Sequence, residues 1–111
     1  MKLDNKTIRE AVELWYEEKE KCIEKYGHIS GWDVSQVTDM SKLFVNDYGY
    51  LSEDYSFNED ISNWDMSNVV NTSYMFFEAS LFNQPIGKWN VSNVINMSGM
   101  FSHATQFNQS L

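Results

Sequence analysis

Residues 57–81 read FNEDISNWDMSNVVNTSYMFFEASL, and residues 82–106 repeat the pattern as FNQPIGKWNVSNVINMSGMFSHATQ. An earlier and shorter copy, ISGWDVSQVTDMSKLF, starts at Ile29. A fixed period of 25 residues is typical of stacked supersecondary units, because a single repeat cannot bury its own apolar face. The sequence therefore predicts a short solenoid of about three coils.

Each repeat carries apolar anchors at matching positions. In the second copy the anchors are Phe57, Ile61, Trp64, Val69, Met75 and Phe76, and in the third they are Phe82, Ile86, Trp89, Val94, Met100 and Phe101. We expect Ile61 and Ile86 in short strands that pair in parallel between coils. The Ser-Asn segment after each tryptophan favours a turn, and the spacing from Val94 to Phe101 favours a short helical turn. These patterns together predict an α/β repeat.

An insertion separates the first two repeats. The step from Phe44 to Phe57 is 13 residues, whereas the step from Phe76 to Phe82 is 6. Insertions in solenoids map to loops and often lie on the binding face. We therefore predict a partner-binding loop at about residues 45–56, with the candidate binding residues Tyr48, Tyr50, Tyr55, Asp47, Glu53 and Asp54.

The first part of the chain has a helical pattern. Residues 5–26 place Ile8, Val12, Trp15 and Cys22 on one apolar stripe, and Gly27 is a suitable stop. We expect one amphipathic helix that caps the first coil, because an uncapped solenoid end exposes core residues. The expected organisation is a cap over 1–27 and repeats over 28–111, divided into 28–56, 57–81, 82–106 and a partial 107–111.

Nothing comparable to the capping helix follows the third repeat. The sequence stops at FNQSL, which matches the start of a coil. This pattern is compatible with a fragment of a longer repeat protein or with an open edge that supports homo-oligomerisation.

Composition and charge narrow the functional classes. The apolar fraction of 42% favours a packed core over disorder. The net charge is −8, and all acidic residues after residue 26 lie between Asp33 and Glu78. A basic phosphate-binding footprint is absent, which argues against direct binding of nucleic acid. The sequence shows no membrane span and no signal peptide, so as written it indicates a cytoplasmic protein.

Several residues of this sequence are of types that can serve either chemistry or packing. The acids lack the ligand spacing of a calcium loop, which favours a solvated face over a metal site. The tryptophans at repeat positions favour packing over sugar stacking, and Asn58, Asn83 and Asn108 favour an internal ladder. Cys22 is expected to be buried and inert, and His28 to bond local backbone. No catalytic motif and no cofactor site is present, so we expect no enzyme.

Residues 28–111 resemble the BspA-like leucine-rich-repeat family, in particular its branch of roughly 25-residue Mycoplasma- and lactobacillus-type surface-protein repeats. The motifs that carry the resemblance are Phe-Asn, Trp-Asp/Asn, Ser-Asn-Val and Met-Phe at matching spacing. The resemblance implies a right-handed, leucine-rich-repeat-like solenoid and a role in adhesion or protein binding. It implies no active site. Members of such families are often exposed at the cell surface.

Three functional interpretations remain open at the level of sequence. The first is a protein–protein interaction module that binds an unidentified protein through the insertion. The second is an acidic decoy that blocks a nucleic-acid-binding or defence protein by imitating a phosphate backbone. The third is a structural segment of a longer surface protein.

Overall fold

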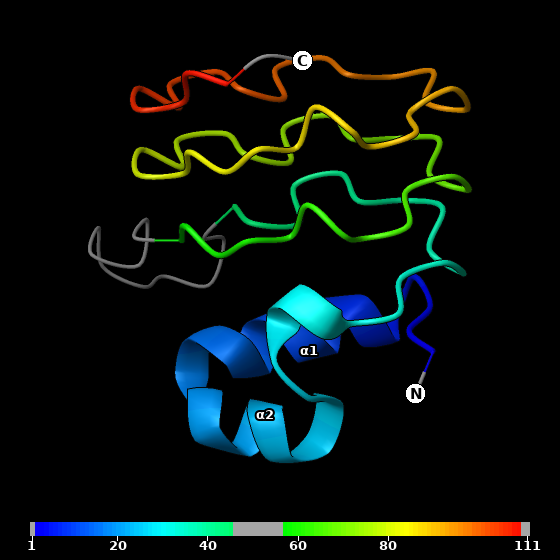
Figure 1. The fold of residues 1–111 in the computed structure, drawn as a ribbon, viewed down its shortest axis with the longest axis vertical. Coiled ribbons are helices and arrows are strands. Elements are labelled where there is room, and N and C mark those ends of the chain that lie inside the picture. Colours follow the sequence, from blue (N-terminus) through cyan, green and yellow to red (C-terminus); the bar gives the residue numbers. More distant parts are fainter. Residues whose placement is uncertain (1, 46–56, 110–111) are drawn as a thin grey trace.

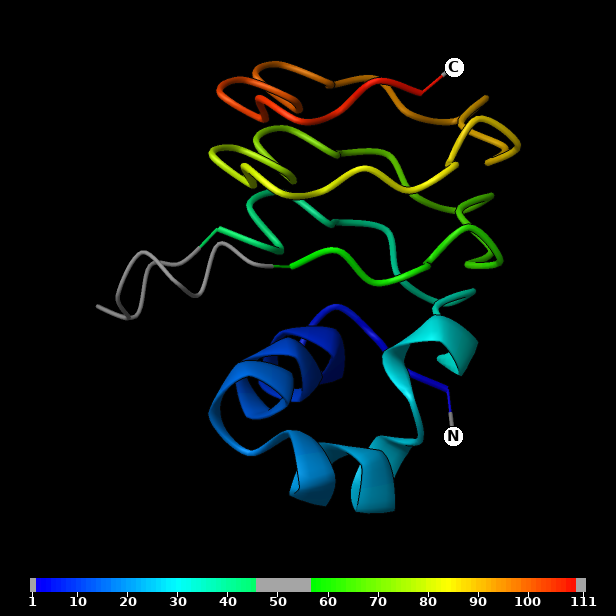
Figure 2. The same cartoon turned by 60° about the vertical axis from the view of Figure 1, so that its left-hand side comes forward.

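The computed structural model describes residues 2–45 and 57–109, and it shows two helices followed by stacked layers of turns (Figure 1). Helix α1 spans Thr7–Glu17, helix α2 spans Lys19–Tyr26, and a short 3₁₀ helix, η1, spans Ile29–Gly31. Figures 1 and 2 both place the helices at one end of the molecule and residues 82–109 at the other. The Cα radius of gyration of 13.0 Å is that of a compact chain of this length.

The prediction of one continuous helix over residues 5–26 is wrong. The chain breaks at Glu18, whose φ of −146° and ψ of 76° are not helical. The break lets α2 fold back beneath α1 (Figure 2), so that the Cys22 Sγ lies 3.3 Å from the Ala11 carbonyl oxygen, which accepts its hydrogen bond. Tertiary packing therefore outweighs the good helix propensity of the glutamates and lysines around Glu18.

The repeats pair through their backbones in parallel register. Isolated parallel bridges join Asp39 to Asn71 and Asn71 to Asn96. Every second N–H of residues 72–78 donates to a carbonyl in the following repeat, as in the bond from Phe76 to Met100 at 2.9 Å. The repeats consequently stack as layers, with equivalent residues one above another.

In the described residues, isolated bridges and single turns stand where strands and helical turns were expected. Ile61 and Ile86 do not lie in strands, because each begins a turn. The carbonyl of each isoleucine accepts the N–H of the tryptophan three residues later. A helical turn after Thr72 cannot propagate, since Tyr74 and Glu78 adopt left-handed φ values of 56° and 58°.

The core consists of aromatic columns that run through the layers. One column stacks Phe44, Phe76 and Phe101 with successive ring centroids 5.4 and 5.6 Å apart. A second column stacks Phe57, Phe82 and Phe107 at 5.9 Å for both steps. The anchors of the second repeat are buried, which confirms the core positions that the repeat pattern predicted.

Helix α1 covers the first layer. Its residues Ile8, Ala11, Val12 and Trp15 are buried in the same core as the repeats. Just before α1, the N–H of Leu3 donates to the Asp33 carbonyl at 3.0 Å, within a parallel bridge between Lys2 and Asp33. In the part of the chain that the structure describes, no helix is long and apolar enough to cross a membrane.

Candidate interaction surface

The six residues expected to bind a partner lie outside the described residues. They belong to segment 46–56, and they are Tyr48, Tyr50, Tyr55, Asp47, Glu53 and Asp54. Val45, which precedes the segment, closes a turn by donating its N–H to the Lys42 carbonyl at 3.0 Å. Phe57, which follows it, is buried. The role of the six residues stays a prediction. Val45 is the last described residue before them in the chain, so the surface around Val45 is the described surface that adjoins the segment.

An aromatic cluster lies on the surface beside Val45. Tyr74 and Phe77 pack edge to face with ring centroids 5.7 Å apart, and Phe77 packs in the same way on the His103 ring at 5.7 Å. Tyr74 is 40% exposed and His103 is also exposed. Edge-to-face packing fixes the rings relative to one another while it leaves ring surface open to a partner. We call Tyr74, Phe77 and His103 the aromatic patch.

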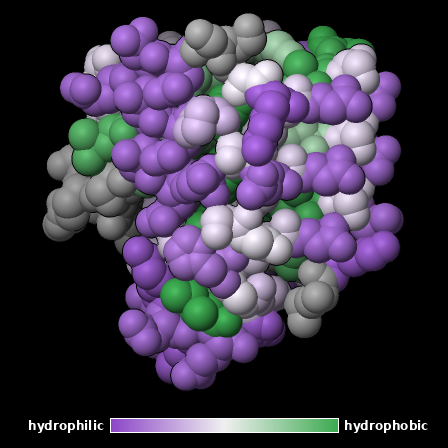
Figure 3. Space-filling view, viewed as in Figure 1, coloured by the Kyte–Doolittle hydropathy of each residue, from purple (hydrophilic) through white to green (hydrophobic). Residues whose placement is uncertain are grey.

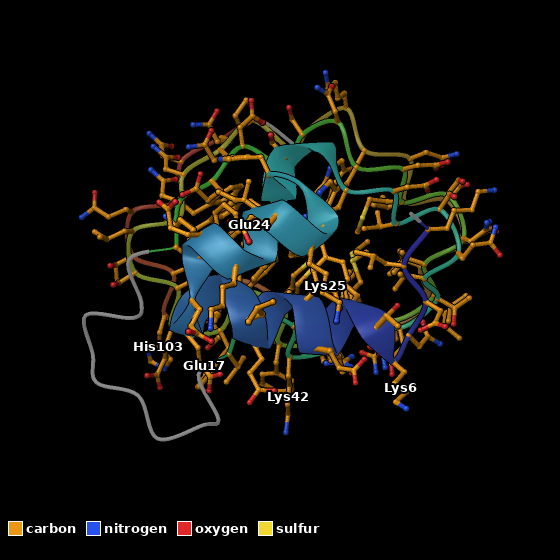
Figure 4. The ribbon with its side chains drawn as sticks, turned by 90° about the horizontal axis from the view of Figure 1, so that it is seen from below. Lys6, Glu17, Glu24, Lys25, Lys42 and His103 are labelled. Atoms are coloured by element: carbon orange, nitrogen blue, oxygen red, sulfur yellow. The ribbon has the colours of Figure 1, made fainter. Side chains whose placement is uncertain are left out.

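A surface pocket connects the aromatic patch to the first repeat. Lys42, Val45, Tyr74 and Phe77 line it, and its volume is about 360 Å³. Figure 4 shows Lys42 projecting outward past α1, with His103 farther along the same side of the molecule. Among the described residues Lys42 forms no ion pair. The surface thus combines apolar rings with an unpaired ammonium group.

The turn geometry explains why Tyr74 and Phe77 face outward. Met75 and Phe76, between them in the sequence, are fully buried. The left-handed conformation of Tyr74 turns the chain immediately before this buried pair. The Tyr74 ring then lies against Gly99 of the next repeat and leaves no room there for a Cβ atom. The patch is therefore held by the same backbone that forms the core.

The aromatic patch was missed by reasoning from the sequence, although one signal for it exists. Lys42, Tyr74 and Gly99 occupy equivalent positions in the three repeats, and all three have φ between 56° and 63°. Glycine at one of three equivalent positions indicates a left-handed residue at the other two. That conformation separates the outward residue from the buried pair that follows it.

Several of the described acidic residues take part in local turns and ion pairs. Hydrogen bonds from the hydroxyl and then the N–H of Ser67 hold the pKa of the Asp65 carboxyl below its usual value, and the Ser35 hydroxyl and N–H do the same for Asp33. Hydrogen bonds from Ser62 likewise hold the pKa of the Asp60 carboxyl below its usual value. These bonds are the Asx turns that the short polar residues favour.

Two further acids bridge the helices and the repeats. The Asp39 carboxylate lies 3.6 Å from the Arg9 guanidinium, and the Glu59 carboxylate lies 3.8 Å from both Lys19 Nζ and His28 Nε2. In residues 2–45 and 57–109, no group of three or more His, Cys, Asp or Glu side chains is arranged to hold a metal ion.

The tryptophans pack in the core, as predicted. Trp32, Trp64 and Trp89 are at most 8% exposed. Their indole N–H groups are satisfied by backbone carbonyls, as in the bonds from Trp64 to Ile29 at 2.8 Å and from Trp89 to Ile61 at 3.0 Å. These buried indole bonds connect successive layers.

The asparagine ladder forms, but on the surface. The Asn58 Oδ1 accepts the N–H of Asn83 at 2.8 Å, and the Asn83 Oδ1 accepts the N–H of Asn108 at 3.0 Å. All three asparagines are exposed, so the prediction of an internal ladder is wrong in its location. Solvent can reach the ladder because the neighbouring phenylalanines, such as Phe82, turn inward and occupy the core.

Cys22 and His28 behave as expected. Cys22 is fully buried, and burial raises the pKa of its thiol. Such a thiol is a poor nucleophile. The His28 Nδ1 accepts the N–H of Ser30 at 3.2 Å and thereby caps η1.

Comparison with known proteins gives one family. A family model described as "Mycoplasma protein of unknown function, DUF285" matches residues 11–111. No curated protein and no solved structure matches the chain. The match spans α2 and every described repeat, and it agrees with the resemblance of residues 28–111 to Mycoplasma-type repeats. The chain belongs to the DUF285 family.

Proposed function

We propose that this chain is a non-enzymatic protein-interaction module built on a right-handed, leucine-rich-repeat-like solenoid of the BspA-like type. The observation that carries the proposal is the aromatic patch of Tyr74, Phe77 and His103 beside the Lys42 pocket. The partner is a protein that places apolar or aromatic side chains on the patch and an acidic group near Lys42.

The patch has the properties of an interaction hot spot. Aromatic side chains provide large contact areas and lose little conformational entropy on binding. Tyr74 and Phe77 flank the fully buried Met75 and Phe76, so their backbone is held in place before a partner arrives. Preorganisation of this kind lowers the entropic cost of association.

The predicted loop is joined to the same surface through Val45. Val45 lines the pocket, and the segment with Tyr48, Tyr50 and Tyr55 starts at the next residue. A partner seated on the patch would therefore meet the attachment point of that segment. Binding residues on loops that a rigid scaffold supports are common in interaction modules.

The test is an affinity purification from the source cell with wild-type protein and two matched variants, read by mass spectrometry. The patch variant combines Tyr74→Ser with Phe77→Ser. The control variant is Ile95→Ser, because Ile95 is 87% exposed and is not part of the patch. We expect a partner that the wild type and the control retain at moderate salt and that the patch variant loses.

The interpretation of that experiment requires folded variants, which far-UV circular dichroism and thermal unfolding will establish. Equal retention by the patch variant and the wild type would reject the patch as the binding site. A further variant with Tyr48, Tyr50 and Tyr55 changed to alanine separates the predicted loop from the patch. If the partner is a nucleic-acid-binding protein released by moderate salt, the acidic-decoy interpretation replaces this proposal.

A further inference from the structure

The Lys42 pocket lies between two walls that stacked turns build. In the first layer the Val45 N–H donates to the Lys42 carbonyl at 3.0 Å, and in the second layer the Phe77 N–H donates to the Tyr74 carbonyl at 3.2 Å. Lys42 and Tyr74 form one wall, and Val45 and Phe77 form the other. The Cα atoms at the two ends of such a turn are less than about 7 Å apart. The pocket is therefore narrower than an α-helix, which is about 10 Å across with its side chains.

The Tyr74 ring leans away from the first layer. Its Cδ1 and Cε1 atoms occupy the space that a Cβ atom on Gly99, in the third layer, would need. The ring thereby leaves open a space of about 360 Å³ beside Lys42, Val45 and Phe77. A cavity of roughly 150 Å³ is enough for a benzene ring, so the Lys42 pocket has room for one aromatic side chain.

The walls of the Lys42 pocket favour an aromatic ligand group. The planes of the Tyr74 and Phe77 rings are 77° apart, so the two rings offer both a face and an edge to a third ring. The side of the molecule shown in Figure 3 is mostly hydrophilic, with apolar atoms in small separate areas. A pocket with two aromatic rings and a valine is thus a distinctive surface of this molecule.

Charged groups lie at different heights along the Lys42 pocket. Lys42, in the first layer, is exposed and forms no ion pair within the parts of the chain that the structure describes. The exposed Glu78 follows Phe77 and faces the third layer, where the Ser102 carbonyl accepts its N–H at 2.9 Å. An anionic ligand group is therefore attracted beside Lys42 and repelled beside Glu78. The net charge of −8 opposes this attraction only weakly, because physiological salt screens charges beyond about 8 Å.

The layer spacing sets the distance between the acidic and the aromatic group of a ligand. Layers that pair through backbone hydrogen bonds lie about 4.8 Å apart. In an extended peptide, side chains two residues apart point to the same side and are about 6.6 Å apart. An acidic and an aromatic residue with one residue between them therefore reach Lys42 and the two rings together, since the flexible lysine stem takes up the difference.

We propose that the Lys42 pocket binds an extended segment of a partner protein, in which an aspartate or glutamate lies two residues from a phenylalanine or tyrosine. The carboxylate pairs with Lys42, and the aromatic ring lies between Val45, Tyr74 and Phe77. This inference rests on the proposed function and adds to it the sequence motif and the conformation that the site recognises. The geometry places the acid on the side of the helices and is compatible with either chain direction.

The test is an NMR titration of the ¹⁵N-labelled 111-residue chain with short synthetic peptides. The two probe peptides carry Asp-Gly-Phe or Phe-Gly-Asp between glycine and serine residues, one for each chain direction. We expect one of them to cause saturable shifts of the amide signals of Lys42, Val45, Tyr74 and Phe77. Asparagine in place of the peptide aspartate should weaken binding about two- to fivefold, as expected for an exposed ion pair. Alanine in place of the phenylalanine should weaken it more than about tenfold.

Charge reversal at Lys42 tests the position of the acid. We expect Lys42→Glu to bind the corresponding lysine peptide more tightly than the aspartate peptide, whereas the wild type has the opposite preference. The matched control is Lys88→Glu, because Lys88 is exposed, bonds the Asn63 Oδ1 at 3.0 Å and does not line the Lys42 pocket. It should keep the preference of the wild type. The dispersion of the amide spectrum establishes that each variant is folded.

Three results would overturn the inference. Equal binding of the aspartate and asparagine peptides would show that the Lys42 pocket does not select an acidic group. The same change of preference in Lys42→Glu and Lys88→Glu would show a response to net charge alone. The absence of saturable binding of both probe peptides at millimolar concentration would show that the pocket does not take an extended acidic–aromatic segment.

The affinity purification with the Tyr74→Ser, Phe77→Ser variant separates this inference from the proposed function. If that variant loses a captured protein and neither probe peptide binds, the aromatic patch is an interaction surface, but it recognises a different kind of segment. If the variant retains every captured protein and neither probe peptide binds, both the proposed function and this inference are rejected. If the variant loses the captured protein and the aspartate peptide displaces that protein from the wild type, both are supported.

Discussion

The two ends of the repeat stack differ in how the backbone hydrogen-bonding groups at their edges are paired. At the helical end, Arg9 donates from Nη1 to the Ser41 carbonyl at 2.9 Å and from Nη2 to the Asp39 carbonyl at 3.2 Å. In the layer above, the equivalent carbonyls of Asn71 and Ser73 receive backbone N–H groups from the neighbouring repeat. One guanidinium therefore replaces two main-chain donors of a preceding coil.

Asn5 replaces a backbone acceptor of a preceding coil. Its Oδ1 accepts the N–H of Thr38 at 2.8 Å, as the Thr38 carbonyl accepts the N–H of Val70 in the layer above. At the opposite end, no comparable side chain among the described residues accepts the backbone N–H groups of Met97, Gly99, Phe101 and His103. A cap therefore has to match the polar edge of a coil as well as cover its apolar face.

The largest expected effect comes from equivalent phenylalanines at different depths of the stack. Phe76 is fully buried between Phe44 and Phe101, whereas Phe101, among the described residues, has a neighbour in this aromatic column on one side only. We expect Phe76→Ala to cost about 3–5 kcal/mol of unfolding free energy and Phe101→Ala roughly half of that. Urea denaturation followed by circular dichroism measures both. Equal costs of the two substitutions would show that Phe101 is covered in solution.

A middle-sized effect is expected at the helical end. Arg9→Met keeps the apolar stem but removes both donors, and we expect a loss of about 1–2 kcal/mol, since the Asp39 and Ser41 carbonyls lose charge-assisted bonds. Arg9→Lys should recover only part of the loss, because an ammonium group lacks the fork of the guanidinium.

The control for the Arg9 variants is Lys6→Met, at an exposed position immediately before α1. It should change the unfolding free energy by less than about 0.5 kcal/mol. Similar losses for Arg9→Met and Lys6→Met would contradict a capping role of the two Arg9 hydrogen bonds and would point to net charge instead.

The sequence could predict the parts of the fold that repeat. Trp64 and Phe76 recur at fixed spacing, and a residue that recurs in every layer is one that neighbouring layers bury. The expectation of buried tryptophans was confirmed for the same reason. In contrast, the break at Glu18 occurs in a run of good helix formers, and only the packing of Cys22 onto α1 reveals it.

The candidate site was less accessible to prediction. The direction of Tyr74 and Phe77 depends on left-handed φ values at residues that are not glycine, such as Tyr74 and Glu78. Such conformations are rare for these residue types, and the one signal for Tyr74 in this sequence is Gly99 at the equivalent position of the third repeat. The capping role of Arg9 depends on where α1 meets the first layer, which no local pattern encodes.

The smallest effect concerns acid stability, and it separates repeats that carry aspartate from the one that carries asparagine. Asp33 and Asp65 are equivalent to Asn90, whose Oδ1 accepts the N–H of Ser92 at 3.1 Å in the same kind of turn. The serine hydrogen bonds lower the pKa of both aspartates in the folded state. Their stabilisation is therefore complete above the ordinary pKa of about 3.9 and is lost as the pH falls through the lower, folded pKa.

We expect the double variant Asp33→Asn and Asp65→Asn to retain its turns and to show a smaller decrease of the urea midpoint below about pH 4 than the wild type. The reverse change, Asn90→Asp, should increase that decrease, because it adds a third carboxylate with a serine two residues later. Urea unfolding at a series of pH values measures both changes. Identical acid profiles for all three proteins would show that these turns do not contribute to the pH dependence. A profile changed by the double variant but not by Asn90→Asp would set the open-end layer apart from the two layers nearer the helices.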